Sequence, residues 1–333
     1  WIGAIRVDMG IITQGAVVAL YNYMSQILTE LIKLANLIIN ITKSVACGNR
    51  IQSIFEMQPS ITDGSGQKVD KVQTDTADRS EEAEYAVEFS HVGLTYAGAG
   101  DESLTDIDFK VKKGETIGII GGTGSGKSSV VNLIPRFYDV TSGFIKVDGK
   151  DVKDYPLEEL RGKIGTVLQK AVLFHGTIRE NLKWGNPDAT EEDLNRAITV
   201  AQAKEFIDNK EGRLDFEIEQ GGKNLSGGQR QRLTIARAVV KKPEILILDD
   251  SASALDFATD AALRKAIREM EGETTVFIVS QRAASIQHAD RIVVLDDGKI
   301  VGLGTSEELL ESCEVYQEIY NSQFKKQEGG KTA

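Results

Sequence analysis

The order of apolar and polar residues divides the chain into three main parts. Residues 11–43 are apolar but interrupted by polar residues at helical spacing, which predicts one long helix. Residues 57–84 are rich in Asp, Ser, Thr, Gly and Lys and have little to bury, which predicts a linker. From residue 85 to about residue 325, short apolar runs alternate with helical stretches, and a polar tail follows over residues 326–333. The alternation predicts an α/β domain.

Seven short apolar runs are the candidate strands of that domain. Several are continuously apolar, as expected of strands that are buried on both faces of a mostly parallel sheet. The seven runs are residues 85–92, 115–120, 144–149, 164–168, 244–249, 274–280 and 291–296.

The helix predicted over residues 11–43 has two interpretations. At about 1.5 Å per residue it would be roughly 50 Å long, which exceeds the roughly 30 Å hydrocarbon core of a bilayer. It is either an amphipathic helix packed on a soluble core, or a membrane-spanning helix whose polar residues face other helices or a wet cavity. It is not a signal peptide, because it lacks a basic start and a cleavage site. The chain begins with Trp1 rather than Met, so we expect it to be a fragment or a processed product.

Composition narrows the classes of function. Lys and Arg total 39 against 50 Asp and Glu, for a formal net charge of −11. This balance argues against a nucleic-acid partner, since neutralising phosphates requires clustered cations. Two cysteines are too few for a disulfide scaffold and fit a reducing compartment. The three histidines lie far apart, without Cys or His beside them, so we expect no zinc site.

A glycine-rich loop follows the strand predicted at residues 115–120. Residues 121–128 have the spacing G-x-x-x-x-G-K-S of a phosphate-binding loop, and a helical stretch follows. In such a loop, backbone N–H groups and a helix N-terminus point at one anion. Lys127 would contact the β- and γ-phosphates of ATP, and the Ser128 hydroxyl would ligate Mg²⁺. The predicted phosphate-binding residues are Gly121, Gly122, Thr123, Gly124, Ser125, Gly126, Lys127, Ser128 and Ser129.

A second apolar strand, residues 245–248, ends in Asp249. An apolar strand that ends in an acid is the form of the Walker B strand, which holds Mg²⁺ in P-loop NTPases. Together with the loop above, it predicts Asp249 as a metal ligand.

The motif between these two elements resembles a known family. Residues 225–229 read LSGGQ, followed by Gln231-Arg232 and the helical stretch LTIARAVVKKP, and this resembles the signature of ABC ATPases. Two glycines and a serine at a helix N-terminus form a second anion site. One chain does not need two triphosphate sites at this spacing. We therefore expect Leu225, Ser226, Gly227, Gly228 and Gln229 to cover the ATP of another subunit in a head-to-tail dimer.

The resemblance implies a P-loop NTPase fold with a mostly parallel sheet, an antiparallel β subdomain and a helical subdomain. It also implies roles for three further residues. Tyr96 corresponds to the aromatic residue that stacks on adenine, and Gln169 to the residue that touches Mg²⁺ and the transmembrane domain. Asp256 ends the Ser253–Asp256 loop that crosses the dimer interface.

The N-terminal part resembles the last membrane helix of an exporter half-transporter, which favours the membrane-spanning interpretation. Residues 1–56 would then end a transmembrane domain, and residues 85–325 would be a cytoplasmic nucleotide-binding domain. The implied full-length protein is multi-pass in the plasma membrane, contacts the lipid bilayer, and exports a hydrophobic or drug-like small molecule. The residues that carry this resemblance are Trp1, Gly3, Thr13, Gly15, Ala46, Arg50, Ile51, Ile54 and Phe55.

Two residues at catalytic positions depart from the pattern of active family members, which have Glu and His there. Asp250 replaces the Glu that polarises the attacking water, and its shorter carboxylate should fall about 1–1.5 Å short, a displacement that can cost about a hundredfold in rate. Gln281 replaces the His and can hydrogen-bond a γ-phosphate but cannot titrate. With Gln169, these are the candidate catalytic positions. We hypothesise that this chain's own site binds ATP tightly and hydrolyses it poorly.

A weak site of this kind favours a heterodimer, whose second half-transporter would supply the competent site. Three alternatives remain open. The first is a homodimeric exporter in which Asp250 is adequate. The second is a non-transport ABC ATPase, which the acidic charge and the apolar helix argue against. The third is a regulatory subunit that holds ATP without turnover.

Overall fold

The computed structural model describes residues 1–57, 59–64, 84–251, 253–270 and 273–328, which form two compact units divided after Thr62. Most of the expected linker, residues 65–83, and the last five residues of the expected tail lie outside the described residues. The final described helix runs to Glu328, past the expected domain end at residue 325.

The first unit contains two helices, α1 (Ile2–Asp8) and α2 (Gln14–Glu56). Thr13 caps α2, because its hydroxyl accepts a hydrogen bond from the Ala16 N–H at 3.3 Å. The structure describes every residue of both helices, and none of them is buried. The expected long helix is therefore confirmed, and by length and composition α2 could cross a membrane.

A six-stranded sheet forms the centre of the second unit. Its strand order is β12-β11-β3-β10-β9-β6, and every neighbouring pair is parallel except β11 and β12. Strand β9 is buried along its whole length, which explains its continuous apolar sequence. The strands are β3 (Thr116–Gly121), β6 (Ile164–Val167), β9 (Ile245–Asp249), β10 (Thr275–Val279), β11 (Arg291–Asp296) and β12 (Lys299–Gly304).

A four-stranded antiparallel sheet, ordered β2-β1-β4-β5, forms the expected β subdomain. Phe89 and Phe109 stack across β1 and β2 with ring centroids 4.6 Å apart, and both are buried. The strands are β1 (Tyr85–Leu94), β2 (Leu104–Lys112), β4 (Ser142–Val147) and β5 (Lys150–Asp151). A third, two-stranded sheet pairs β7 (Gly176–Thr177) with β8 (Glu217–Ile218).

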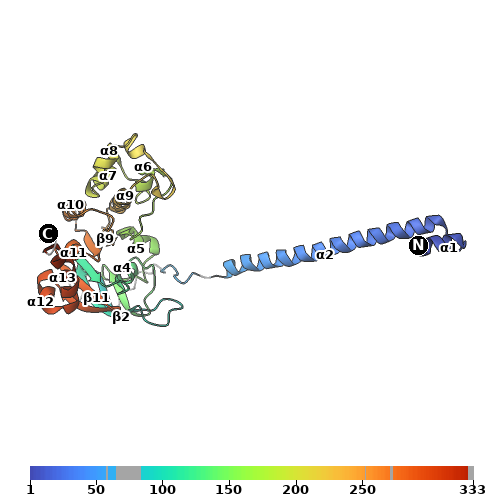
Figure 1. Ribbon diagram of the computed structural model, residues 1–333. Helices are drawn as coiled ribbons and strands as arrows, with labels where there is room; N and C mark the ends of the chain where they lie inside the picture. Colours follow the sequence, from blue (N-terminus) through green and yellow to red (C-terminus); the bar gives the residue numbers. More distant parts are fainter. Residues whose placement is uncertain (58, 65–83, 252, 271–272, 329–333) are drawn as a thin grey trace. The chain divides into compact units, whose positions relative to one another are not determined.

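Helices surround these sheets, and α6 to α9 gather in one lobe, the expected helical subdomain (Figure 1). Leu194 of α7 and Ile235 of α9 share a buried cluster with Leu246 of β9, which packs this lobe against the central sheet. The helices are α4 (Lys127–Leu133), α5 (Leu157–Lys163), α6 (Ile178–Lys183), α7 (Glu191–Val200), α8 (Lys204–Asp208), α9 (Gly227–Val239), α10 (Phe257–Arg268), α11 (Ala283–Ile286), α12 (Ser306–Ser312) and α13 (Glu314–Glu328).

Each of the seven predicted runs corresponds to one strand: β1, β3, β4, β6, β9, β10 and β11. The prediction missed β2 and β12, together with the two-residue strands β5, β7 and β8. The expected fold class is confirmed.

Candidate functional site

The candidate site lies at the carboxyl ends of four neighbouring parallel strands, β3, β10, β9 and β6. The phosphate-binding loop follows β3, Asp249 ends β9, Gln281 follows β10, and Gln169 follows β6. Because parallel strands end at the same edge of a sheet, residues far apart in the sequence meet there.

The phosphate-binding loop depends on glycines with left-handed backbone. Gly124 has φ of 85° and Gly126 has φ of 93°, a region that disfavours residues with a side chain. Gly126 is also the N-cap of α4, and a Cβ there would lie 2.6 Å from Leu104 Cδ2. The loop therefore needs glycine at position 126 for both its dihedral angle and its packing against β2.

Lys127 is the first residue of α4 and only 9% exposed. Its Nζ donates hydrogen bonds to the carbonyl oxygens of Gly121 at 3.0 Å and Gly122 at 2.5 Å. Burial lowers the pKa of Lys127, and the nearby Asp249 and Asp250 only partly oppose this. A poorly solvated ammonium of this kind gains stability when an anionic phosphate enters the cleft.

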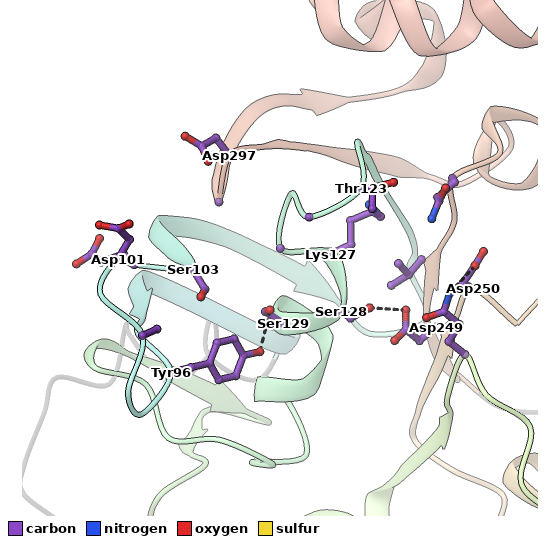
Figure 2. A pocket seen from close by; sticks show the side chains of 18 of the residues that line it. Tyr96, Asp101, Ser103, Thr123, Lys127, Ser128, Ser129, Asp249, Asp250 and Asp297 are labelled. Carbon is purple, nitrogen blue, oxygen red and sulfur yellow. Dashed lines mark hydrogen bonds between the residues drawn. The ribbon is translucent and has the colours of Figure 1, made fainter.

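Ser128 and Asp249, the two strongest metal-ligand candidates, are in direct contact. The Ser128 hydroxyl donates to Asp249 Oδ1 at 3.0 Å (Figure 2). Burial raises the pKa of Asp249, with a contribution from Asp250, while the bond from Ser128 and the charge of Lys127 lower it. A hydroxyl and a carboxylate are hard oxygen donors, so this pair fits Mg²⁺, which takes few protein ligands and completes its shell with substrate phosphates.

The two expected catalytic positions and Gln169 line the same cleft. Asp250 has a left-handed φ of 46°, and its N–H donates to the Val279 carbonyl oxygen at 2.9 Å, which ties the end of β9 to β10. The Gln169 side-chain amide donates to Asp250 Oδ2 at 3.2 Å. Gln169, a predicted metal ligand, therefore lies beside the predicted catalytic carboxylate.

Tyr96 lies at the other end of the cleft. Its hydroxyl donates to Ser129 Oγ at 2.9 Å, which joins the loop after β1 to α4. The Tyr96 ring packs edge-to-face with the Tyr138 ring. The ring centroids are 4.9 Å apart and the ring planes make an angle of 86°. The ring is thus fixed in position before any base binds.

The cleft has a volume of about 660 Å³. Figure 2 shows Tyr96 near one end and Asp249 and Asp250 near the other, with Lys127 and Ser128 between them. Sequence reasoning missed several lining residues, which lie on the loop before β2 and on the β11–β12 turn. They include Asp101, Glu102, Ser103, Asp297 and Gly298. The polar run at residues 101–103 and the Asp-Asp-Gly turn at residues 296–298 were the available signals.

The signature residues lie elsewhere, since none of residues 225–229 is among the described residues that line this cleft. Ser226 is the N-cap of α9: its hydroxyl accepts a hydrogen bond from the Gln229 N–H at 3.3 Å, and Gln229 Oε1 accepts one from the Ser226 N–H at 3.1 Å. Apart from its chain neighbours and the backbone of its own helix, no described residue has an atom within 4 Å of a Cβ built on Gly227, so the N-terminus of α9 is open to approach there. Asp256 likewise caps α10, accepting from the Thr259 N–H at 2.9 Å.

The comparisons with known proteins identify the family. Residues 104–253 match the ABC transporter family. An uncharacterized ABC transporter ATP-binding protein of Mycobacterium tuberculosis is 39% identical over 326 residues, which cover 97% of this chain and 54% of that protein. A Bacillus subtilis protein that is named a putative multidrug export ATP-binding/permease protein is 37% identical. The matched residues cover 94% of this chain and 52% of that protein.

The structure of a bacterial Atm1-family ABC exporter with ATP bound superimposes with a TM-score of 0.76 and 29% identity, covering 94% of this chain and 53% of the exporter chain. This chain therefore spans about half the length of the relatives it matches. Residues 104–253 therefore belong to the ABC transporter family, and the chain as a whole resembles about half of an exporter-type ABC transporter protein.

Proposed function

We propose that this chain is the ATP-binding part of an ABC exporter in the plasma membrane, in which ATP binding and hydrolysis drive export of a hydrophobic or drug-like molecule. The observation that carries the proposal is the division of the ATP machinery. The Lys127 loop and the Ser128–Asp249 pair share one cleft, whereas the signature helix begins outside it. A second subunit would bring its own signature to this cleft. The exporter relatives support the same interpretation.

In this proposal different residues of the cleft bind different parts of the ATP molecule. Tyr96 stacks on adenine, while Lys127 and the loop N–H groups bind the β- and γ-phosphates. Ser128 and Asp249 would hold Mg²⁺, which would neutralise charge on the phosphates. Two nucleotide-binding domains close on two ATP molecules, and closure moves the membrane helices, because ATP binds the closed state more tightly.

We further infer that the cleft of this chain hydrolyses ATP poorly. Asp250 is one methylene shorter than Glu, and Gln169 donates a hydrogen bond to its carboxylate, so Asp250 is poorly placed to accept a proton from water. Gln281 has no titratable group. A heterodimer keeps one competent site despite these residues, because the other subunit can supply Glu and His and receive the signature of this chain.

The decisive experiment measures ATP affinity and single-turnover hydrolysis by this chain, unaltered and with Asp250→Glu combined with Gln281→His. We expect tight binding with negligible turnover in the unaltered chain, and a rise of about a hundredfold or more in the double variant. Asp297→Glu is the matched control, because it adds the same methylene to another acid of the cleft and should leave turnover unchanged. Fast turnover by the unaltered chain would refute the weak-site inference.

The oligomeric state needs a separate test. The complex is isolated from the membranes of the native cell, and its polypeptide species are counted. We expect two different half-transporters. A single species whose ATPase activity is abolished by Asp250→Asn would instead establish the homodimeric exporter.

A further inference from the structure

The loop that carries Gln281 is held by a side chain from the last helix of the domain. Gln323 of α13 donates from Nε2 to the Gln281 carbonyl oxygen at 2.7 Å. Its Oε1 accepts a hydrogen bond from the Ala283 N–H at 2.9 Å. One carboxamide therefore binds the backbone on both sides of Arg282, and we call these two hydrogen bonds the Gln323 clamp.

The clamp acts on a loop that already touches two other parts of the site. The loop follows β10, and its first residue is tied to the neighbouring strand β3, which leads into the phosphate-binding loop: the Ser280 N–H donates to the Ile119 carbonyl oxygen at 3.1 Å. Arg282 donates from Nη2 to the Ser253 carbonyl oxygen at 3.3 Å, in the loop before α10. Gln281 lies between these two contacts and lines the cleft.

Two features make Gln323 suitable for this role. Helix α11 begins at Ala283, and its N-cap residue Arg282 provides no side-chain hydrogen bond, so Gln323 supplies the missing acceptor from outside the helix. Helix α13 is itself firmly seated: Tyr316 is fully buried and shares a hydrogen bond of 2.8 Å with Ser306 Oγ. Gln323 therefore extends from a rigid support.

We propose that Gln323 is a positioning residue for nucleotide recognition: it fixes the Gln281 backbone so that the Gln281 side chain meets the γ-phosphate of ATP. The inference rests on the proposed ATP-binding function but not on hydrolysis or on the identity of the partner. Residues 281–283 and 323 all lie outside the segment that matches the ABC transporter family. The clamp thus links the C-terminal helix to the end of the cleft where ATP and ADP differ.

The test measures dissociation constants of the full chain for ATP and for ADP. Gln323→Ala should weaken ATP binding by about two- to tenfold, the effect of losing one or two hydrogen bonds, and should leave ADP binding unchanged because ADP lacks the γ-phosphate. Gln323→Glu keeps the acceptor for the Ala283 N–H but loses the donor to the Gln281 carbonyl oxygen. It should therefore also reduce the ratio of ATP affinity to ADP affinity, which we call the preference for ATP. Equal weakening of ATP and ADP by Gln323→Ala, or an unchanged preference in Gln323→Glu, would overturn the inference.

Two further variants separate positioning from general stability. Gln317→Ala removes another side-chain hydrogen bond of α13, the one to the Leu310 carbonyl oxygen at 2.8 Å, and should not change the preference for ATP. In a Gln281→Ala background, Gln323→Ala should have no further effect on ATP affinity, because the clamp acts through Gln281. Additive losses in that background would refute the role. A wild-type chain that binds no ATP would instead refute the proposed function.

Discussion

The role of Tyr96 can be tested by separating the base from the phosphates of ATP. Tyr96 stands at the cleft with its hydroxyl bonded to Ser129 and its ring braced by Tyr138. Stacking of a base on an aromatic ring is worth about 1–3 kcal/mol, so Tyr96→Ala should weaken ATP binding about 5- to 150-fold. The Tyr96→Phe variant keeps the ring and loses only the hydrogen bond to Ser129, worth about 0.5–1.5 kcal/mol. It should therefore bind ATP more tightly than Tyr96→Ala does.

The assay is titration calorimetry with two ligands, ATP and inorganic tripolyphosphate. Tripolyphosphate has no base, so Tyr96→Ala should leave its affinity unchanged while ATP affinity falls. Tyr138→Ala removes the edge-to-face support of the Tyr96 ring, worth about 0.5–1.5 kcal/mol, and should give an intermediate loss for ATP alone. Equal losses for both ligands in Tyr96→Ala would mean that Tyr96 acts through Ser129 and the phosphate loop. An unchanged ATP affinity would place the base elsewhere.

Three further predictions follow from single residues. Gly126→Ala should lower the free energy of unfolding by about 1–3 kcal/mol, measured by denaturant titration, and should reduce ATP affinity, measured by binding titration. Gly100→Ala, at an unstrained position in the same cleft, should change neither quantity. Ser128→Ala should weaken Mg²⁺-ATP binding but not Mg²⁺-free ATP binding, measured with and without EDTA. Hydrogen bonds from Lys242 and Thr190 hold the pKa of Asp193 at about 2, below its ordinary 3.8, so the ionised carboxylate stabilises the fold. This contribution is present at neutral pH and is lost as the pH falls towards 2. Compared with the unaltered chain, Asp193→Asn should therefore have a lower melting temperature at pH 7, and that temperature should depend less on pH below 4.

The strands of the central parallel sheet with continuous apolar runs were the most readily predicted, whereas β2 and β12 were missed. The sequence ILILD of β9 predicts a buried parallel strand without further information. In β2, buried and more exposed positions alternate, because one face packs on the core while charged residues such as Lys110 and Lys112 point to solvent. The register of β2 with β1 buries Phe109 against Phe89. The alternation of residues 107–112 is itself a strand pattern that the sequence prediction overlooked. Edge strand β12 was missed for a similar reason.

The candidate site was predictable where a local motif sets the geometry. The glycine spacing of residues 121–128 determines loop, helix N-terminus and lysine together, so Lys127 was found from sequence. Asp297 and Ser103 reach the same cleft through loops that the fold brings near the phosphate site. Gln323 lies 42 residues from Gln281 in the chain, and a glutamine on an amphipathic helix gives no signal of what it contacts. Only the tertiary structure identifies a residue such as Gln323.

The signature helix illustrates why capping and ligand binding need not be competing explanations. The Ser226 hydroxyl accepts a hydrogen bond from its own helix, which uses one lone pair of the oxygen. A serine hydroxyl also has one hydrogen to donate. Ser226 can therefore donate a hydrogen bond to a phosphate of the ATP bound by an opposite subunit while it caps α9. The open approach at Gly227 lets that phosphate come close to the backbone N–H groups. The capping box therefore fixes the donors before the proposed partner binds, so the entropic cost of ordering them falls on folding of the chain rather than on closure of the proposed dimer.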